Sequence, residues 1–131
     1  MLQIIAIAIG GALGALSRYG LVAWVTRHVE EHFPDVGSFP FGTLVVNILG
    51  SLLIGVCYVV VLDRLQLSPQ WQAITMVGFL GAFTTFSTFS LETLVMLQDG
   101  RYVAALSYIL LSVVVCVVAV LGGITLAKQL I

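Results

Sequence analysis

The chain has 131 residues, of which 60% are hydrophobic and 8% are charged, and its formal net charge at pH 7 is −1. A soluble domain carries about 25% charged residues, so this composition excludes a protein with a water-facing surface. The near-neutral charge gives no reason to expect a nucleic-acid partner. The chain is therefore predicted to be a single integral membrane domain, residues 1–131, with the lipid bilayer as its main environment.

The predicted fold is all-α, because each apolar stretch is long enough to cross a bilayer as a helix, which takes about 20 residues. Charged residues separate four such stretches, at about 2–25, 41–62, 70–97 and 102–126. The apolar residues run continuously instead of alternating with polar ones, which argues against a β-barrel. No Lys or Arg precedes the first stretch, and it is expected to be a retained span and not a signal peptide.

Small residues and one arginine mark the first predicted span. Gly10 and Gly14 are four residues apart, as are Gly11 and Ala15, so another helix can approach this face closely. Arg18 lies more than one turn inside the end of the span, where a charge is costly. Two interpretations stay open for Arg18: it pairs with a carboxylate or with carbonyl groups of a neighbouring helix, or it attracts ions directly.

The connection at 26–40 holds most of the polar side chains. His28, Glu31 and His32 match the H-x-x-E-H pattern of some zinc peptidases. No soluble fold is available to supply a third ligand and a cleft, and Pro34 follows at once. We therefore interpret the segment as a short amphipathic turn at the membrane interface.

The second span carries no charge, and one of its faces is polar and narrow. Thr43 and Asn47 are one turn apart on a face that continues through Gly50, Ser51 and Gly55. Asn47 is the unusual residue. It is either an interhelical hydrogen-bond partner or a side-chain donor turned toward a pore.

The third span contains the least regular stretch, Gly78 to Phe89, which has two glycines and a Thr-Thr-Phe-Ser-Thr run. Ser and Thr compete for backbone hydrogen bonds, and β-branched residues form helices poorly. The third helix is therefore expected to break in mid-membrane. A broken backbone is tolerated in a bilayer only where protein buries it or where it lines a watery cavity, so the break is a candidate ion site.

Polar residues follow the expected break and recur in the fourth span. Glu92 is the only acidic side chain well inside a charge-poor stretch. It is a helix-end carboxylate near the headgroups, a partner for Arg18, or a functional group. In the fourth span Tyr108, Ser112 and Cys116 repeat every four residues, and this donor-bearing stripe suggests a hydrated path.

The loop charges predict no preferred orientation in the membrane. Four spans place both termini on one side, where Arg64 and Lys128 lie, and the other side holds Arg27 and Arg101. Two against two gives almost no insertion bias under the positive-inside rule. Both orientations are then made, which permits an antiparallel homodimer whose two-fold axis lies in the membrane plane.

Three motifs in order along the chain, Gly10–Tyr19, Gly42–Gly50 and Gly78–Phe89, resemble the Fluc (CrcB) family of fluoride channels. The resemblance implies a fluoride-selective channel, and not an enzyme, in the cell's inner (plasma) membrane. It implies a dual-topology, antiparallel homodimer with two pores that export cytoplasmic fluoride down its electrochemical gradient.

The resemblance also implies pore residues. Phe86 and Phe89 would line the pore, Asn47 would be a donor near them, and Tyr108 with Ser112 would form a polar track. Closely spaced donors and the positive edges of aromatic rings suit an anion that must lose its tightly held water. The predicted pore set is completed by three hydroxyl residues: Thr43, Ser87 and Thr88. Cys116 is left out because a thiol is a weaker donor.

A sodium site is implied as well. The backbone carbonyls of Gly81 and Thr84 from both subunits would hold a structural Na⁺ on the two-fold axis, with no organic cofactor. Arg18 matches the family's first-helix arginine, and Arg18 and Glu92 are expected to have structural or electrostatic roles.

Without the resemblance, composition and spacing specify only a narrow polar pore or a transporter, because Ser, Thr and Asn serve cations as acceptors as readily as they serve anions as donors. The alternative is a small four-span, proton-coupled exporter of cationic drugs. Such an exporter needs a membrane-embedded carboxylate. The first span has none, and Glu92 lies beyond the expected break.

Overall fold

The computed structural model describes residues 1–34 and 38–131, and every long regular element in these ranges is a helix. Four of the helices are long and apolar enough to cross a membrane: Leu2–His32, Phe41–Arg64, Pro69–Gln98 and Tyr102–Leu130. The predicted all-α architecture with four potential spans is therefore confirmed.

Helix α1 (Leu2–His32) and helix α6 (Tyr102–Leu130) are each one continuous element, whereas the second and third spans are composite. The second span is α2 (Phe41–Cys57) followed by the π-helical segment η2 (Tyr58–Arg64). The third span consists of α3 (Pro69–Gln72), the π-helical segment η3 (Ala73–Leu80), α4 (Gly81–Phe83) and, after a gap, α5 (Phe86–Gln98).

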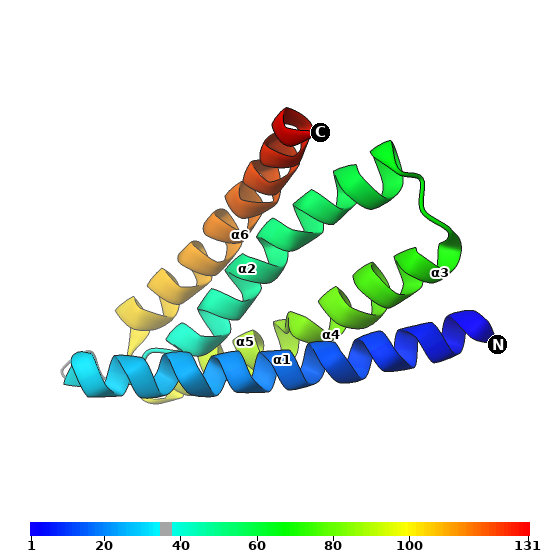
Figure 1. Cartoon of the computed structure of the whole chain (residues 1–131). Coiled ribbons are helices and arrows are strands. Elements are labelled where there is room, and N and C mark those ends of the chain that lie inside the picture. The colour runs from blue at the N-terminus through cyan, green and yellow to red at the C-terminus, as the bar shows by residue number, and fades with distance from the viewer. Residues whose placement is uncertain (35–37) are drawn as a thin grey trace.

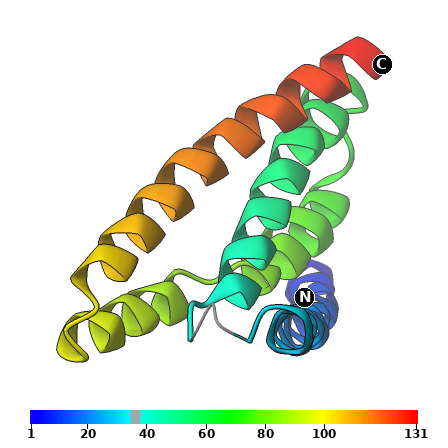
Figure 2. The same cartoon turned by 90° about the vertical axis from the view of Figure 1, so that its left-hand side faces the viewer.

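The helices form two pairs that meet at one end of the molecule and diverge toward the other (Figure 1). One pair is α1 with the α3–α4 part of the third span, and the other is α2 with α6. Both termini lie at the diverging end. Helix α5 crosses between the first turns of α2 and of α6 at the opposite end (Figure 2). The third span therefore begins beside α1 and ends beside α6.

Glycines allow close packing within each pair. A Cβ atom at Gly10 or Gly14 would collide with the carbonyl oxygen of Ile74 or of Phe79, so α1 packs backbone against backbone on η3. In the pair formed by α2 and α6, a Cβ atom at Gly123 would collide with the carbonyl oxygen of Leu52. At Gly11, the first member of the second small pair, there is room for a side chain, because a Cβ there would meet no atom within 4 Å.

Helix α1 extends beyond the first predicted span and includes residues 26–32, so the turn predicted there is wrong. This segment contains neither glycine nor proline, and its backbone bonds continue until the Phe33 N–H donates to the Val29 carbonyl at 2.8 Å. The remainder of the predicted connection, residues 33–40, is outside any α-helix where it is described, and residues 35–37 lie outside the described residues.

The two π-helical segments have no signal in the sequence. In η2, the Leu65 N–H reaches the carbonyl five residues back, Val60 O, at 3.0 Å. Such wide turns arise where packing replaces the usual hydrogen bonds between residues four apart with bonds between residues five apart. Segment η3 is the part of the third span against which α1 packs most closely, and close backbone approach there is a tertiary effect.

Candidate functional site

The third span is interrupted at Thr84 and Thr85, inside the stretch that the sequence indicates. Helix α4 ends at Phe83, Thr84 (φ −83°, ψ 159°) and Thr85 (φ −150°, ψ 117°) are extended, and α5 begins at Phe86. The Thr84 hydroxyl donates to the Leu80 carbonyl at 3.0 Å, and the Thr85 hydroxyl accepts from the Thr88 N–H at 3.2 Å. The threonines thus end one helix and cap the next.

Asn47 of α2 makes hydrogen bonds to the backbone of the interruption. Its Nδ2 donates to the Thr85 carbonyl at 3.0 Å, and its Oδ1 accepts from the Thr85 N–H at 2.8 Å. In a continuous helix that N–H would bond to the carbonyl of Gly81. Asn47 therefore replaces a helical bond with a bond between spans, which is the interhelical interpretation, and only one of its amide hydrogens is left for another acceptor.

Arg18 reaches the same interruption from α1. Its Nη1 donates to the Thr84 carbonyl oxygen at 3.4 Å, so the arginine is anchored on a backbone carbonyl of the neighbouring span. It does not pair with Glu92, which has other partners. The carbonyl that Arg18 contacts is one of the two predicted sodium ligands.

A cavity of about 410 Å³ opens beside the interruption and is called the break cavity. The described residues that line it include no charged side chain. Its lining contains several predicted site residues and the thiol that was left out of the prediction: Asn47, Gly81, Thr84, Phe86, Phe89, Ser112 and Cys116.

Ser112 is the most informative residue of this lining. Its side chain is only 8% exposed, and its Oγ has no hydrogen-bond partner within the described ranges. An unpaired buried hydroxyl is costly, so it favours a cavity that holds water or another small acceptor.

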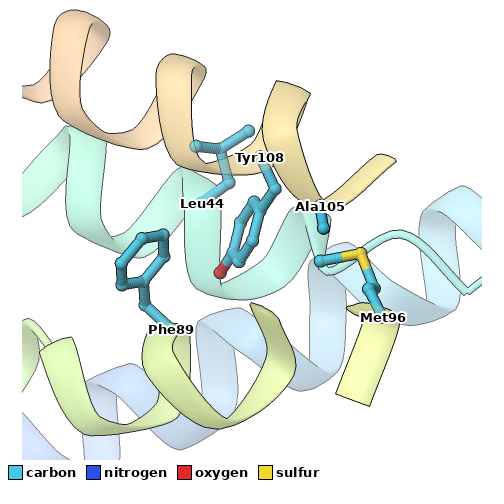
Figure 3. Packing of buried hydrophobic residues seen from close by; sticks show 5 residues of the cluster. All are labelled: Leu44, Phe89, Met96, Ala105 and Tyr108. Carbon is cyan, nitrogen blue, oxygen red and sulfur yellow. The ribbon is translucent and has the colours of Figure 1, made fainter. Parts of the chain in front are cut away.

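The two phenylalanines differ in burial although both line the break cavity. Phe86 is 78% exposed and Phe89 is 9% exposed, and their ring centroids are 5.4 Å apart. Phe89 continues the contact inward to Tyr108, at 5.1 Å between centroids. Figure 3 shows Phe89 rising from α5 toward the Tyr108 ring, which descends from α6 beside Leu44 of α2.

Tyr108 is fully buried, and its hydroxyl contacts the carboxylate of Glu92. Its hydroxyl donates to Oε2 of Glu92 at 2.7 Å, and the Thr43 hydroxyl donates to Oε1 at 2.8 Å. Glu92 therefore joins α2, α5 and α6 and is not the isolated helix-end carboxylate that was one interpretation. An anion that used these two hydroxyls would have to take the place of the carboxylate.

A second cavity, of about 450 Å³ and called the end cavity, is lined by Glu92 and by residues of α1, α5 and the segment before α2. Its lining includes Glu30, Glu92, Asp99 and Arg101. Arg101 donates through Nη1 to the Ser38 carbonyl at 3.4 Å and to the Ser38 hydroxyl, which ties the α5–α6 turn to the start of α2. Phe89 lines the break cavity and Glu92 lines the end cavity, and Tyr108 contacts both side chains.

Of the five predicted pore hydroxyls, only that of Ser112 lines the break cavity, and the other four line neither cavity. Thr43 and Tyr108 are buried and donate to Glu92. Ser87 and Thr88 are exposed in the first turn of α5 and belong to the hydroxyl network around Thr85. Sequence reasoning did not assign Thr85, Cys116 or Arg101. Thr85 was detectable as an N-cap residue ahead of a helix, whereas the Arg101 contact depends on tertiary structure.

Comparisons with known proteins identify the family of the chain. The family model described as CrcB-like protein, Camphor Resistance (CrcB), matches residues 5–124. The "Fluoride-specific ion channel FluC" of Saccharophagus degradans is 46% identical over 128 residues, covering 97% of this chain and 90% of the relative. The proteins of that name from Hahella chejuensis and Geobacter metallireducens are 47% and 46% identical, over 96% and 99% of this chain and 94% and 100% of their own lengths. The chain therefore belongs to the CrcB family of multi-pass membrane proteins.

Proposed function

We propose that the chain is the subunit of a fluoride-selective ion channel, and not an enzyme. The observation that carries the proposal is the uncharged break cavity, in which two phenylalanine rings and the unpaired Ser112 hydroxyl lie together. Relatives over the whole chain bear the name of fluoride-specific channels. The channel would let fluoride leave the cell passively. HF enters through the lipid and ionises in the cytoplasm, and the fluoride anion then leaves through the channel down its electrochemical gradient.

The lining suits fluoride for physical reasons. A small, strongly hydrated anion needs close donors to replace its water, and the Ser112 hydroxyl and the free amide hydrogen of Asn47 can supply them. The edges of Phe86 and Phe89 carry partial positive charge. No fixed cation lines the break cavity among the described residues, which favours rapid exit.

The functional unit is proposed to be an antiparallel homodimer with two pores, and the helix interruption is proposed to lie at mid-membrane. Phe86 is 78% exposed and Gly81 is also exposed, although both belong to the break cavity. A partner subunit on this face would enclose the cavity. The balanced charges at the two ends of the molecule permit the two opposite orientations that such a dimer needs.

A structural Na⁺ at the dimer axis remains a proposal, and the donor set suits it in part. The Thr85 N–H donates to Asn47 instead of to the Gly81 carbonyl, so this carbonyl lacks its usual helical donor. Both Gly81 and Thr84 line the break cavity. Carbonyl oxygens are suitable ligands for a hard cation. The Thr84 carbonyl already accepts from Arg18, so only its second lone pair would be available. A cation held there would link the two interrupted helices.

The test is fluoride efflux from proteoliposomes, followed with a fluoride electrode at an imposed voltage. Rapid efflux without proton coupling supports the channel. Drug-dependent proton flux with no fluoride efflux supports the exporter, although no carboxylate lines the break cavity among the described residues, and a scaffold shows neither.

Phe86→Ile sharpens the test because it removes the ring edge from an exposed side chain. Efflux should fall at least tenfold, while the free energy of unfolding changes by no more than about 0.5 kcal/mol. Leu94→Ile, an exposed change on the same helix, is the control. Unchanged efflux in Phe86→Ile contradicts the role of the ring edge.

A further inference from the structure

The end of α1 carries a pair of histidines that the proposed channel does not use. His28 and His32 are four residues apart on one helix, so their side chains share a face. Both are exposed, and their ring centroids lie 4.2 Å apart with an interplanar angle of 34°. Trp24, one turn earlier, stacks on His28 at 5.5 Å and 7°. The three rings form a continuous column along α1.

The hydrogen bonding of His32 leaves one of its nitrogens free. Its Nδ1 lies 3.0 Å from the carbonyl oxygen of His28. A carbonyl only accepts, so this contact favours the tautomer with the proton on Nδ1 and the lone pair on Nε2. Histidines that bind metals usually donate their other ring N–H to a carbonyl or a carboxylate in this way.

We infer that His28 and His32 form a two-imidazole binding site for a divalent first-row transition metal ion. Two ring nitrogens about 2.0–2.1 Å from one ion place the ring centroids about 4.5–5 Å apart, so a small side-chain rotation converts the present arrangement into a chelate. Imidazole suits Cu²⁺, Ni²⁺ and Zn²⁺, and affinity should be greatest for Cu²⁺.

The surroundings make the site open and favourable to a cation. No group of three or more His, Cys, Asp or Glu residues suited to a metal occurs in the described ranges, so the described residues supply two imidazole ligands and no third protein ligand. Glu30 and Glu31 add two negative charges to the segment against the one positive charge of Arg27. The site is thus a surface chelate that both charge and helix geometry support.

Binding would act on the last two turns of α1. The helix holds the two residues one turn apart and on one face, so the ion binds the helical form more tightly than the unfolded one and stabilises the helix by mass action. Val29 and Glu30 belong to the same turns and line the end cavity. The inference itself does not depend on fluoride transport, and its test needs no flux measurement.

The experiment uses Trp24 as a local reporter in the purified full-length protein. The chain contains two tryptophans, so Trp71→Phe leaves Trp24 alone. Titration with Cu²⁺ should quench the Trp24 fluorescence in a saturable way, at one ion per chain. His28→Gln and His32→Gln should each raise the half-saturating Cu²⁺ concentration at least tenfold, and Ni²⁺ should bind more weakly than Cu²⁺. Acidification should weaken binding, because a protonated imidazole has no lone pair.

The matched control is Trp24→Phe, which leaves Trp71 as the remaining tryptophan. Trp71 belongs to α3, which lies far from the C-terminal end of α1 that carries the histidines (Figure 1). Its fluorescence should show no saturable quenching over the same range. Electron paramagnetic resonance of the Cu²⁺ complex should report two coordinated nitrogens. Saturable quenching of Trp24 that persists after both histidines are replaced, or a spectrum with no nitrogen ligand, overturns the inference. Circular dichroism of each variant checks that α1 is intact.

Discussion

At the scale of single residues, the Asn47 side chain links α2 to the interrupted backbone of the third span. Its amide makes two hydrogen bonds to one backbone unit, Thr85, at 3.0 and 2.8 Å. The backbone of Thr84 and Thr85 is extended between two helices, so these bonds replace the helical ones that are missing there. The same side chain lines the break cavity, and its structural and conducting roles therefore have to be separated by measurement.

Asn47→Asp is expected to impair both stability and transport. A carboxylate cannot donate to the Thr85 carbonyl, and leaving that buried acceptor unpaired costs about 1–3 kcal/mol. Fluoride efflux should fall at least tenfold, and thermal unfolding in detergent should occur at a lower temperature. Ser51→Ala, which alters the same cavity one turn further along α2, should leave the unfolding temperature almost unchanged. Normal efflux and normal unfolding of Asn47→Asp together contradict this role.

Tyr108→Phe tests the other polar contact between spans. It removes the hydroxyl that donates to Glu92 at 2.7 Å and keeps the buried ring. Loss of a hydrogen bond to a charged group costs about 1.5–3 kcal/mol, so chemical denaturation should show a loss of this size. Tyr102→Phe on the same helix is the control, because Tyr102 is 68% exposed. Equal stability of the two variants would mean that the Glu92 contact contributes nothing.

At the scale of the helices, glycines determine which faces pack. Adjacent glycines in α6 provide a comparison within one turn: a Cβ at Gly123 would collide with the Leu52 carbonyl, whereas at Gly122 the nearest atom would be 4.0 Å away. The two positions share sequence context and helix propensity. Their difference therefore isolates the contact between α2 and α6.

Gly123→Ala should destabilise the protein by about 1–3 kcal/mol, because rigid backbone must move to admit the methyl group. Gly122→Ala should be neutral or slightly stabilising, since alanine forms helices better than glycine. Denaturation in mixed micelles measures both. Similar losses in the two variants would exclude backbone contact as the cause.

At the scale of the whole molecule, the proposed partner subunit would cover the exposed break cavity. Gly81→Ala tests this, because the added methyl group would meet nothing closer than the Met76 carbonyl at 3.7 Å within the chain. The subunit should fold normally, whereas two copies that meet at Gly81 should associate at least tenfold more weakly. Light scattering after size exclusion measures the association. A dimer of unchanged affinity contradicts contact at Gly81.

Antiparallel assembly has a separate test. Two lysines added to the 65–68 loop should bias insertion toward one orientation and abolish efflux, because oppositely oriented partners are no longer made. Two lysines added at the Asp99–Arg101 turn should bias the other way. Co-expression of the two variants should restore efflux, and activity of either variant alone would mean that the subunits lie parallel.

The sequence by itself determined the number of potential membrane spans, the membrane setting and the approximate place of the interruption. These depend on local chemistry: the length of the apolar runs, the position of the charges, and threonines that compete for backbone bonds at Thr84 and Thr85. It also indicated the polar face of α2 and the stripe on α6, because helical periodicity is a local property.

Only the tertiary structure decided what those polar groups contact. The crossing of the helices brings Arg18 to a carbonyl and Glu92 to two hydroxyls. It also leaves Ser112 unpaired and keeps the other four predicted pore hydroxyls, of Thr43, Ser87, Thr88 and Tyr108, outside both cavity linings. The π-helical segments and the extension of α1 to His32 were likewise absent from the prediction. Sequence specifies which faces are polar, but a hydrogen-bond partner is fixed by distances between helices that come together only in the folded chain.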